Sequence, residues 1–205
     1  MASKAGTAAR IALPVPVKAV VIDMDGTLLD TIGDLAGAAN AMRSELGHAP
    51  LDPELLGTFV GKGIVSLVSR PYRGAGKGLR ALRTKGLRLG CVTNKAARFT
   101  QPLLECSGLA GYFEIVLSGD SLPRKKPDPL PLLHAARFFN AEPRELLLIG
   151  DSGNDVQAAR AAGCPVFVVP YGYNEGQDIC ALSYDVLIAG LDEAAKFVEN
   201  AVTST

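Results

Sequence analysis

The stretch that decides the fold reads Val20-Val21-Ile22-Asp23-Met24-Asp25-Gly26-Thr27-Leu28-Leu29-Asp30. Its apolar first part ends abruptly in two carboxylates, Asp23 and Asp25, which Gly26 and Thr27 follow directly. Side chains at positions i and i+2 of a strand share one face, so we expect both carboxylates on the same face of a strand end. Because like charges held this close repel each other, the stretch predicts a site that binds a cation or performs chemistry.

Apolar bursts alternate with amphipathic stretches along most of the chain. The predicted strands are Val17–Ile22, Leu87–Val92, Ile115–Leu117, Leu146–Ile149, Val166–Val169 and Val186–Ile188, and the predicted helices are Leu79–Lys85, Ala96–Ser107, Leu130–Phe139, Asp155–Ala162 and Asp192–Ala201. The strands are almost continuously apolar, as is typical of strands buried on both faces. Gly108 and Gly163 follow two of the helices as C-terminal stops. This alternation predicts an α/β fold, with a doubly wound parallel sheet in a Rossmann-like core.

Residues 31–70 interrupt this alternation after the first strand. Two helical patterns, at about 32–46 and 53–69, follow each other there without a strand between them, and the piece 59–63 breaks the second. We therefore expect a Rossmann-like core formed by residues 18–30 and 72–205, with a small helical cap inserted at residues 31–71.

The bulk composition excludes several classes of protein. A length of 205 residues and a hydrophobic content of 48% suffice for one α/β domain with a small insertion. The 21 basic residues balance the 21 acidic ones, so no nucleic-acid or anionic-membrane partner is expected. No apolar run approaches the roughly 18 residues of a transmembrane helix. Residues 1–17 lack the apolar core of a secretory signal, so we expect a cytoplasmic protein. We expect it to be a monomer or a homodimer.

Four polar clusters follow or flank the predicted strands, which is where α/β proteins place their ligand sites. They are Asp-Met-Asp-Gly-Thr at 23–27, Cys-Val-Thr-Asn-Lys at 91–95, Arg-Lys-Lys-Pro-Asp at 124–128 and Ile-Gly-Asp-Ser-Gly-Asn-Asp at 149–155. Each cluster alone is modest evidence, because a helix cap or a charged surface would explain it. All four in this order predict one shared site at the carboxyl ends of the strands.

The residue types in these clusters suit the transfer of a phosphoryl group. A carboxylate can attack phosphorus only if the repulsion between the two anions is cancelled, which a hard cation such as Mg²⁺ does through oxygen ligands. Asp23 and Asp151 would supply such oxygens, and Lys126 would add fixed positive charge. The turn at Thr93-Asn94 would bind phosphate. Asp25 is placed to protonate a leaving oxygen and to deprotonate water.

The four clusters resemble the motifs of the haloacid dehalogenase superfamily, in its phosphatase branch. The matching motifs are Asp-x-Asp-Gly-Thr-Leu-Leu-Asp from 23, Val-Thr-Asn-Lys from 92, Lys-Pro-Asp-Pro from 126 and Gly-Asp-Ser-x-x-Asp from 150, and the resemblance extends from about 18 to 191. The resemblance implies that Asp23 is the nucleophile and Asp25 the general acid and base, while Lys126 balances charge.

The same resemblance implies a set of binding residues. Thr93 and Asn94 would hold the phosphate, Asp23, Asp151 and the backbone carbonyl of Asp25 would bind Mg²⁺, and Asp155 would support the metal from behind these ligands. Lys62, which lies between two glycines, resembles the substrate-specificity loop of the cap in this family, although a hinge explains it equally well.

Three other segments narrow the resemblance. Residues 118–123, 159–163 and above all Tyr-Gly-Tyr-Asn at 171–174 resemble the phosphoglycolate phosphatases of bacteria within this superfamily. This implies that the substrate is a small phosphorylated metabolite, 2-phosphoglycolate, and that the products are glycolate and phosphate. Phosphatases that act on another small phosphoester share much of the sequence of these segments, so such an activity remains an alternative.

The cap departs from the family pattern. This branch usually carries four cap helices, whereas residues 31–70 have room for two at about 15–20 residues per helix with its loop. Either the cap is naturally short, or a mobile stretch is missing and the numbering runs on across the gap. A short cap would leave the site more open and admit larger phosphoesters or phosphoproteins.

Three other functions remain alternatives on the sequence. A sugar phosphomutase of the same superfamily would return the phosphoryl group to a bound sugar phosphate instead of releasing it. A dehalogenase is disfavoured, because it would have no use for the acid Asp25. A catalytically silent binding protein is disfavoured because Asp23, Asp25, Lys126 and Asp151 are all present.

Overall fold

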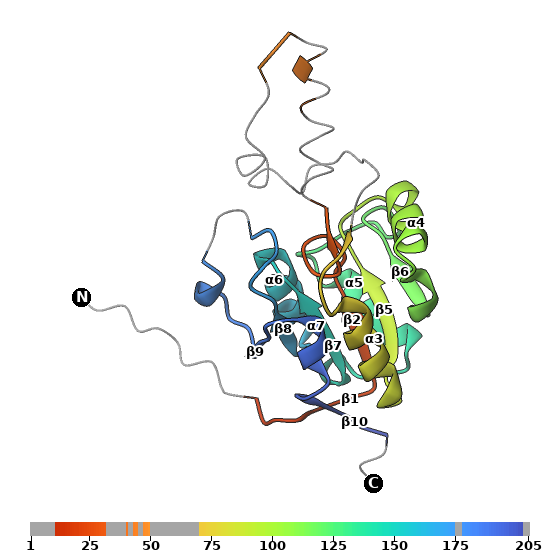
Figure 1. Cartoon of the computed structure of the whole chain (residues 1–205). Coiled ribbons are helices and arrows are strands. Elements are labelled where there is room, and N and C mark those ends of the chain that lie inside the picture. Colours follow the sequence, from red (N-terminus) through yellow and green to blue (C-terminus); the bar gives the residue numbers. More distant parts are fainter. Residues whose placement is uncertain are drawn as a thin grey trace, which may run out of the picture.

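The computed structural model describes residues 11–31, 40, 43–44, 47–49, 70–174 and 178–202, which Figure 1 shows in colour. A six-stranded parallel sheet forms the centre of this part of the chain, in the order β6-β5-β2-β7-β8-β9. The strands are β2 (Ala19–Ile22), β5 (Arg88–Val92), β6 (Ile115–Leu117), β7 (Leu146–Gly150), β8 (Val166–Val168) and β9 (Val186–Leu187). The chain runs outward from β2 on one side and then from β7 on the other, so the strand order reverses between β2 and β7. Ligands of open α/β sheets bind at the carboxyl ends of the strands at such a point.

Helices cover both faces of the sheet. The helices are α3 (Ala75–Thr84), α4 (Ala97–Cys106), α5 (Leu130–Phe138), α6 (Gly153–Ala162) and α7 (Leu191–Ala194), and short 3-10 turns lie at Ala110–Tyr112, Pro143–Glu145 and Ile179–Ala181. One apolar core joins α3, α4 and α7 to the sheet, and a second joins α5 and α6 to its other face. Successive residues of β2 alternate between the two cores: Val20 belongs to the first and Val21 to the second.

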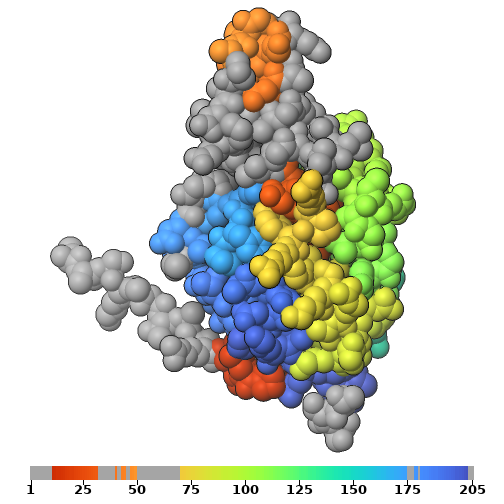
Figure 2. Space-filling model, in the orientation of Figure 1, coloured from red at the N-terminus to blue at the C-terminus, as the bar shows by residue number. Residues whose placement is uncertain are grey.

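Helices α3 and α7 lie against each other on the surface that Figure 2 displays, in yellow and blue. A glycine permits this contact, because a Cβ atom added at Gly78 would lie 2.4 Å from the carbonyl oxygen of Leu191. Among the described residues, no helix is both long enough and apolar enough to cross a membrane.

The six predicted strands and four of the five predicted helices are confirmed, with ends that shift by a few residues. The first strand is divided, since Val17 ends a separate strand β1 (Val15–Val17) and β2 begins at Ala19. Gly108 and Gly163 have φ values of +70° and +77°, so both stop their helices as predicted.

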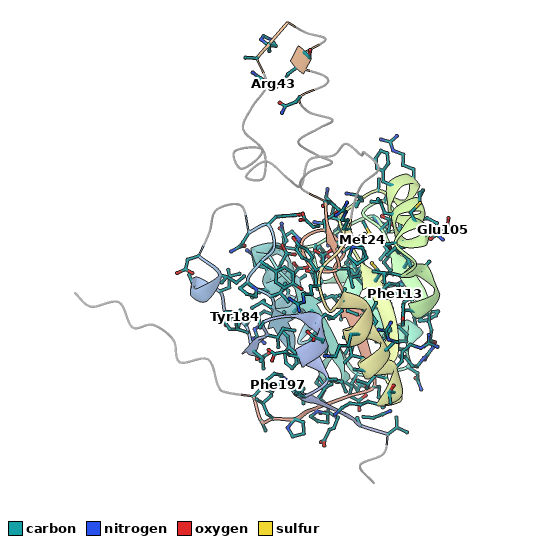
Figure 3. All side chains as sticks on the ribbon, viewed as in Figure 1. Met24, Arg43, Glu105, Phe113, Tyr184 and Phe197 are labelled. Atoms are coloured by element: carbon teal, nitrogen blue, oxygen red, sulfur yellow. The ribbon has the colours of Figure 1, made fainter. Side chains whose placement is uncertain are left out.

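The predicted helix Asp192–Ala201 is wrong beyond its first turn. Helix α7 ends at Ala194, and Val198–Asn200 forms strand β10, which pairs in parallel with β1. Phe197, labelled in Figure 3, packs edge-on against Phe167 with ring centroids 6.3 Å apart. The pairing with β1 and this packing override the local helical pattern, and neither partner is near in sequence.

The insertion leaves and rejoins the core through two short strands. Strands β3 (Leu29–Asp30) and β4 (Arg70–Pro71) pair antiparallel, so the chain returns to the point where it departed. The predicted bounds of the cap, Thr31 and Pro71, are among the described residues. The two helices predicted between them lie almost wholly outside the described residues, and Lys62 lies outside them.

Candidate active site

The loops that follow neighbouring strands place the predicted polar clusters at one edge of the sheet. Asp23 follows β2 directly, and its N–H donates to the carbonyl oxygen of Ile149 in β7 at 2.9 Å. Thr93 follows β5, and its N–H donates to the carbonyl oxygen of Leu117 in β6 at 2.9 Å. Asp151 follows β7. Parallel pairing therefore brings together clusters that are more than a hundred residues apart.

The glycine and threonine of the first cluster fit against Asp151. Gly26 has a φ of +82°, and a Cβ atom added there would lie 2.4 Å from Oδ2 of Asp151. The hydroxyl of Thr27 donates to Oδ1 of Asp151 at 2.9 Å. The turn after Asp25 thus needs glycine both for its left-handed backbone and for the approach of a buried carboxylate.

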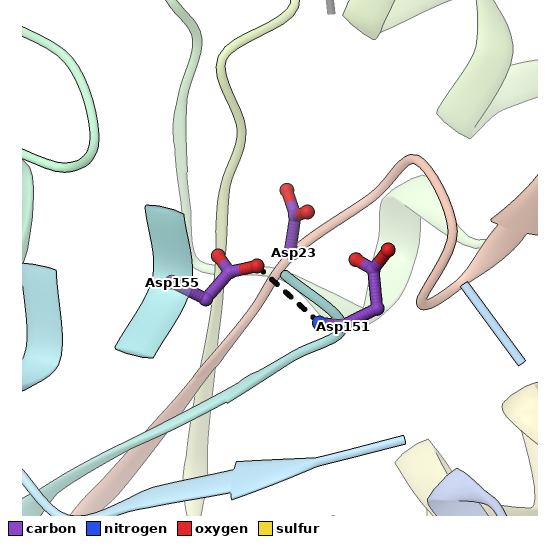
Figure 4. A group of neighbouring side chains, drawn as sticks. All are labelled: Asp23, Asp151 and Asp155. Atoms are coloured by element: carbon purple, nitrogen blue, oxygen red, sulfur yellow. Dashed lines mark hydrogen bonds between the residues drawn. The ribbon is translucent and has the colours of Figure 1, made fainter. Parts of the chain in front are cut away.

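Three buried carboxylates form the centre of the site. Figure 4 shows the side chains of Asp23, Asp151 and Asp155 next to one another. Their oxygens lie within 4.8 Å of one another, and the residues are 7%, 2% and 0% exposed. Burial raises the pKa of Asp23 from 3.8 to about 7, against the opposing charge of Lys126. Burial and the neighbouring Asp23 also raise the pKa of Asp151 well above its ordinary value. The site therefore carries more negative charge than its surroundings compensate.

Lys126 lies buried among three acceptors. Its Nζ donates to the carbonyl oxygen of Val92 at 2.7 Å and to Oδ1 of Asp155 at 2.7 Å, and it lies 2.9 Å from Oδ1 of Asp23. Burial alone would lower the pKa of Lys126, but the two carboxylates outweigh burial and raise it above the ordinary value. All three N–H groups of this ammonium thus have protein partners.

Asp155 is held by protein donors on both oxygens. Its Oδ1 accepts from Lys126, and its Oδ2 accepts from the hydroxyl of Ser152 at 2.6 Å and from the N–H of Ser152 at 3.1 Å. The dashed line in Figure 4 is a further bond to Oδ2, from the N–H of Asp151 at 3.3 Å. Asp155 thus orders the loop of Asp151 and orients Lys126, which fits a supporting position behind the other two carboxylates.

Asp25 has a lysine of its own, which the sequence reasoning missed. Nζ of Lys95 lies 2.9 Å from Oδ1 and 3.1 Å from Oδ2 of Asp25. The side chains of Lys95 and Asp25 are 11% and 19% exposed, so this pair is less buried than Lys126 and its partners. The strand ends at Ile22, and the repulsion expected between Asp23 and Asp25 is reduced because each carboxylate pairs with a different lysine. Lys95 stands in the Val-Thr-Asn-Lys motif, but no local pattern indicated its partner.

Thr93 and Asn94 lie beside both lysines. The hydroxyl oxygen of Thr93 accepts from the N–H of Lys95 at 3.2 Å, and its O–H donates to none of the described residues. Asn94 Nδ2 donates to the carbonyl oxygen of Lys126 at 2.8 Å, while its buried Oδ1 has no partner in the described part of the chain. The hydroxyl of Thr93 is therefore available to donate to a bound anion, whereas the amide of Asn94 holds the Lys126 loop.

A loop after β8 also contacts the site. The N–H of Tyr173 donates to Oδ2 of Asp151 at 2.5 Å, and its hydroxyl donates to Oδ1 of Asp30 at 2.6 Å. The N–H of Thr31 donates to the same hydroxyl at 2.8 Å. Gly172 packs so closely on Asp151 that an added Cβ atom would lie 2.2 Å from Oδ2. The Tyr-Gly-Tyr-Asn segment, noted in the sequence only as a resemblance, thus links Asp151 to the base of the insertion.

The donor set fits a hard divalent cation. Asp23 and Asp151 offer buried carboxylate oxygens close to each other, and burial raises the pKa of both. A hard cation bound between such oxygens would stabilise their ionised forms. No histidine or cysteine belongs to the group that the described residues form, which favours Mg²⁺ over softer metals.

Comparison with known proteins identifies relatives over most of the chain. A family model for haloacid dehalogenase-like hydrolases matches residues 46–163. A phosphoglycolate phosphatase of Nitrosospira multiformis is 49% identical over 91% of this chain and 97% of its own length, and one of Thiobacillus denitrificans is 48% identical over 92% and 98%. A crystal structure of a predicted phosphoglycolate phosphatase from Haemophilus somnus, 28% identical, covers 86% of this chain and 96% of its own with a TM-score of 0.81.

The alignment with one of these relatives also shows a length difference. The alignment with the Nitrosospira multiformis protein spans 221 positions, whereas 91% of 205 residues is only about 187. Roughly 34 positions of that alignment therefore have no residue in this chain.

Proposed function

This chain belongs to the haloacid dehalogenase-like hydrolase family, and from that premise we propose that it is a phosphatase of small phosphomonoesters. The proposed substrate is 2-phosphoglycolate, and the proposed products are glycolate and phosphate. The relatives that carry this name and match nearly their whole length support the substrate. The observation that carries the proposal is the convergence of Asp23, Asp25, Thr93, Lys126 and Asp151 at one edge of the sheet.

In the first step, an oxygen of Asp23 attacks phosphorus. The bond between phosphorus and the ester oxygen breaks, and its electron pair remains on the leaving oxygen, which takes a proton from Asp25. Lys126 keeps Asp23 in place through the 2.9 Å contact, and the Thr93 hydroxyl donates to a phosphoryl oxygen. The product of this step is an aspartyl-phosphate on Asp23.

In the second step, a water molecule attacks the phosphorus of the aspartyl-phosphate. Asp25 now accepts a proton from that water, and the bond between phosphorus and Asp23 breaks to regenerate the carboxylate. Phosphate then leaves. The same carboxyl group thus serves as acid and as base, because the first step leaves it ionised.

The proposed cofactor is Mg²⁺. Asp23, Asp151 and the backbone carbonyl of Asp25 would hold it, with Asp155 behind them. When bound, Mg²⁺ would neutralise the clustered carboxylates and stabilise the charge on the phosphoryl oxygens.

A sugar phosphomutase and a phosphatase of another small phosphoester are the alternatives within the family. A short cap would leave the site more open, and substrates larger than 2-phosphoglycolate would then also fit. Release of phosphate in the absence of a bisphosphate activator would favour the hydrolase over the mutase.

The test measures glycolate and phosphate formed from 2-phosphoglycolate, with Mg²⁺ and with excess chelator. We expect turnover only with the metal, and a loss of roughly 10⁴-fold or more in Asp23→Asn, because that change removes the nucleophile. Glu114→Gln is the control, since it also turns a carboxylate into an amide but lies beside Arg88 at the other end of the strands. Turnover by Asp23→Asn at the wild-type rate would refute the covalent mechanism, and activity confined to other esters would refute the substrate.

A further inference from the structure

We propose that Lys95 is a positioning residue that orients the carboxyl group of Asp25 toward the leaving oxygen. This inference deepens the proposed function and rests on it. It starts from the contacts of Lys95, which differ from those of Lys126 although both lysines lie at the same edge of the sheet.

The backbone of Lys95 is fixed on both sides. Its N–H donates to the hydroxyl oxygen of Thr93 at 3.2 Å, and its carbonyl oxygen accepts from the N–H of Gly119 at 2.7 Å and the hydroxyl of Thr100 at 3.2 Å. Gly119 can approach only because it lacks a side chain, since a Cβ atom there would lie 2.0 Å from the carbonyl oxygen of Asn94. The backbone from which the Lys95 side chain extends is therefore held in place by hydrogen bonds.

The ammonium of Lys95 is committed to Asp25 alone within the described residues. It contacts both carboxylate oxygens, at 2.9 Å and 3.1 Å, and those oxygens accept from no other described group. Two contacts of similar length restrict rotation of the carboxyl group about its terminal bond. Lys126, in contrast, has all its N–H groups bound to Asp23, Asp155 and a carbonyl oxygen, so it cannot orient Asp25 as well.

This contact suits both steps of the reaction. In the first step, the contact with Lys95 holds the carboxyl group of Asp25 facing the leaving oxygen. One oxygen of Asp25 can keep its contact with Lys95 while the other exchanges its contact with Lys95 for the leaving oxygen or the water. A carboxylate anchored in this way is then oriented to accept a proton from water in the second step.

Phosphate esters whose leaving groups differ in basicity distinguish the orientation of Asp25 by Lys95 from a role of Lys95 in phosphate binding or in folding. An alkoxide needs a proton as it departs, so hydrolysis of 2-phosphoglycolate or ethyl phosphate depends on an oriented acid. Nitrophenolate departs without a proton. The formation of aspartyl-phosphate from p-nitrophenyl phosphate therefore does not depend on an oriented acid. The value of kcat/KM reports events up to the first irreversible step, which is the step where the leaving group matters.

The experiment compares kcat/KM of the whole chain and of Lys95→Met for these three esters, with Mg²⁺ present. We expect a loss of roughly 10- to 100-fold for both alkyl esters, within the range that general acid–base catalysis supplies, and less than about 3-fold for the aryl ester. Lys95→Arg should recover part of the alkyl activity, because it keeps a cation near Asp25. Lys77→Met is the matched control, since it breaks an exposed pair with Asp192 and should change none of the three values.

Each of the following results would contradict the role proposed for Lys95. Equal losses on alkyl and aryl esters would assign Lys95 to phosphate binding or to folding. A loss confined to 2-phosphoglycolate, with a raised KM, would show that Lys95 binds the substrate carboxylate instead. Unchanged values for all esters would remove any role in the reaction. A wild-type chain that hydrolyses no ester would instead refute the proposed function, and the inference with it.

Discussion

Two lysine–aspartate clusters lie at the same edge of the sheet and differ in burial. In the inner cluster, Lys126 is joined to Asp23 and Asp155, and the lysine side chain is 2% exposed. In the outer cluster, Lys95 is joined to Asp25, with side chains 11% and 19% exposed. The inner ammonium has no N–H left for another partner, whereas the outer carboxylate has one partner among the described residues and remains accessible.

This difference separates two tasks that the same pair of residue types can perform. Removing charges from water is costly, so a buried cluster is stable only when every partner is present and fixed. A partly exposed pair is held weakly enough to change partners during a reaction. We therefore interpret the inner cluster as the scaffold of the nucleophile and the outer cluster as the adjustable acid and base.

The largest change in stability should follow from breaking the inner cluster. Lys126→Met leaves Asp23 and Asp155 buried without their cation, and we expect the free energy of unfolding to fall by about 3–5 kcal/mol. Urea unfolding at pH 7 with chelator present measures this effect. A loss below about 1 kcal/mol, the value expected for an exposed pair, would contradict the distinction between the clusters.

A dependence on pH should also distinguish the inner cluster. The pKa of Asp23 is 3.8 in the unfolded chain and about 7 in the folded protein, so the folded protein binds more protons between these values. Without metal, the free energy of unfolding should therefore fall as pH rises from about 4 to about 7, by roughly 2–4 kcal/mol in total. Urea unfolding across this range should show a shallower slope in Asp23→Asn but not in Glu114→Gln. A free energy that instead rises over this range would contradict the burial of an unbalanced carboxylate.

The smallest change in stability should follow from breaking the outer cluster. Lys95→Met leaves Asp25 in contact with water, so we expect the free energy of unfolding to change by about 1 kcal/mol or less. Thermal or urea unfolding beside Lys77→Met measures this effect. If Lys95→Met destabilised the protein as much as Lys126→Met, the outer pair would be part of the scaffold and not an adjustable element.

The sequence predicted the sheet and the edge of the sheet at which the polar clusters lie. Asp23 and Asp151 illustrate why. Each directly follows an apolar strand, and parallel strands place such residues at the same edge wherever they stand in the chain. The predicted sheet, its helices and the edge that holds the polar clusters could thus be inferred from local periodicity. The helix predicted at 192–201 failed because β10 depends on β1, a partner almost the whole chain away.

The partners of individual charges could not be predicted in this way. Nothing in Val-Thr-Asn-Lys indicates that Lys95 reaches Asp25 across 70 residues. Nor does the Tyr-Gly-Tyr-Asn segment reveal that the N–H of Tyr173 holds Asp151. Such contacts depend on loop paths that differ by a few ångströms, whereas strand periodicity fixes only the edge from which a loop starts.

By itself, the sequence determined which strands are buried and which residue types gather at their carboxyl ends, because those properties follow from local alternation of apolar and polar side chains. Only the tertiary structure decided that Lys126 pairs with Asp23 while Lys95 pairs with Asp25. The physical reason is that an ion pair depends on distance and burial in space, and these are set when the separate loops pack together.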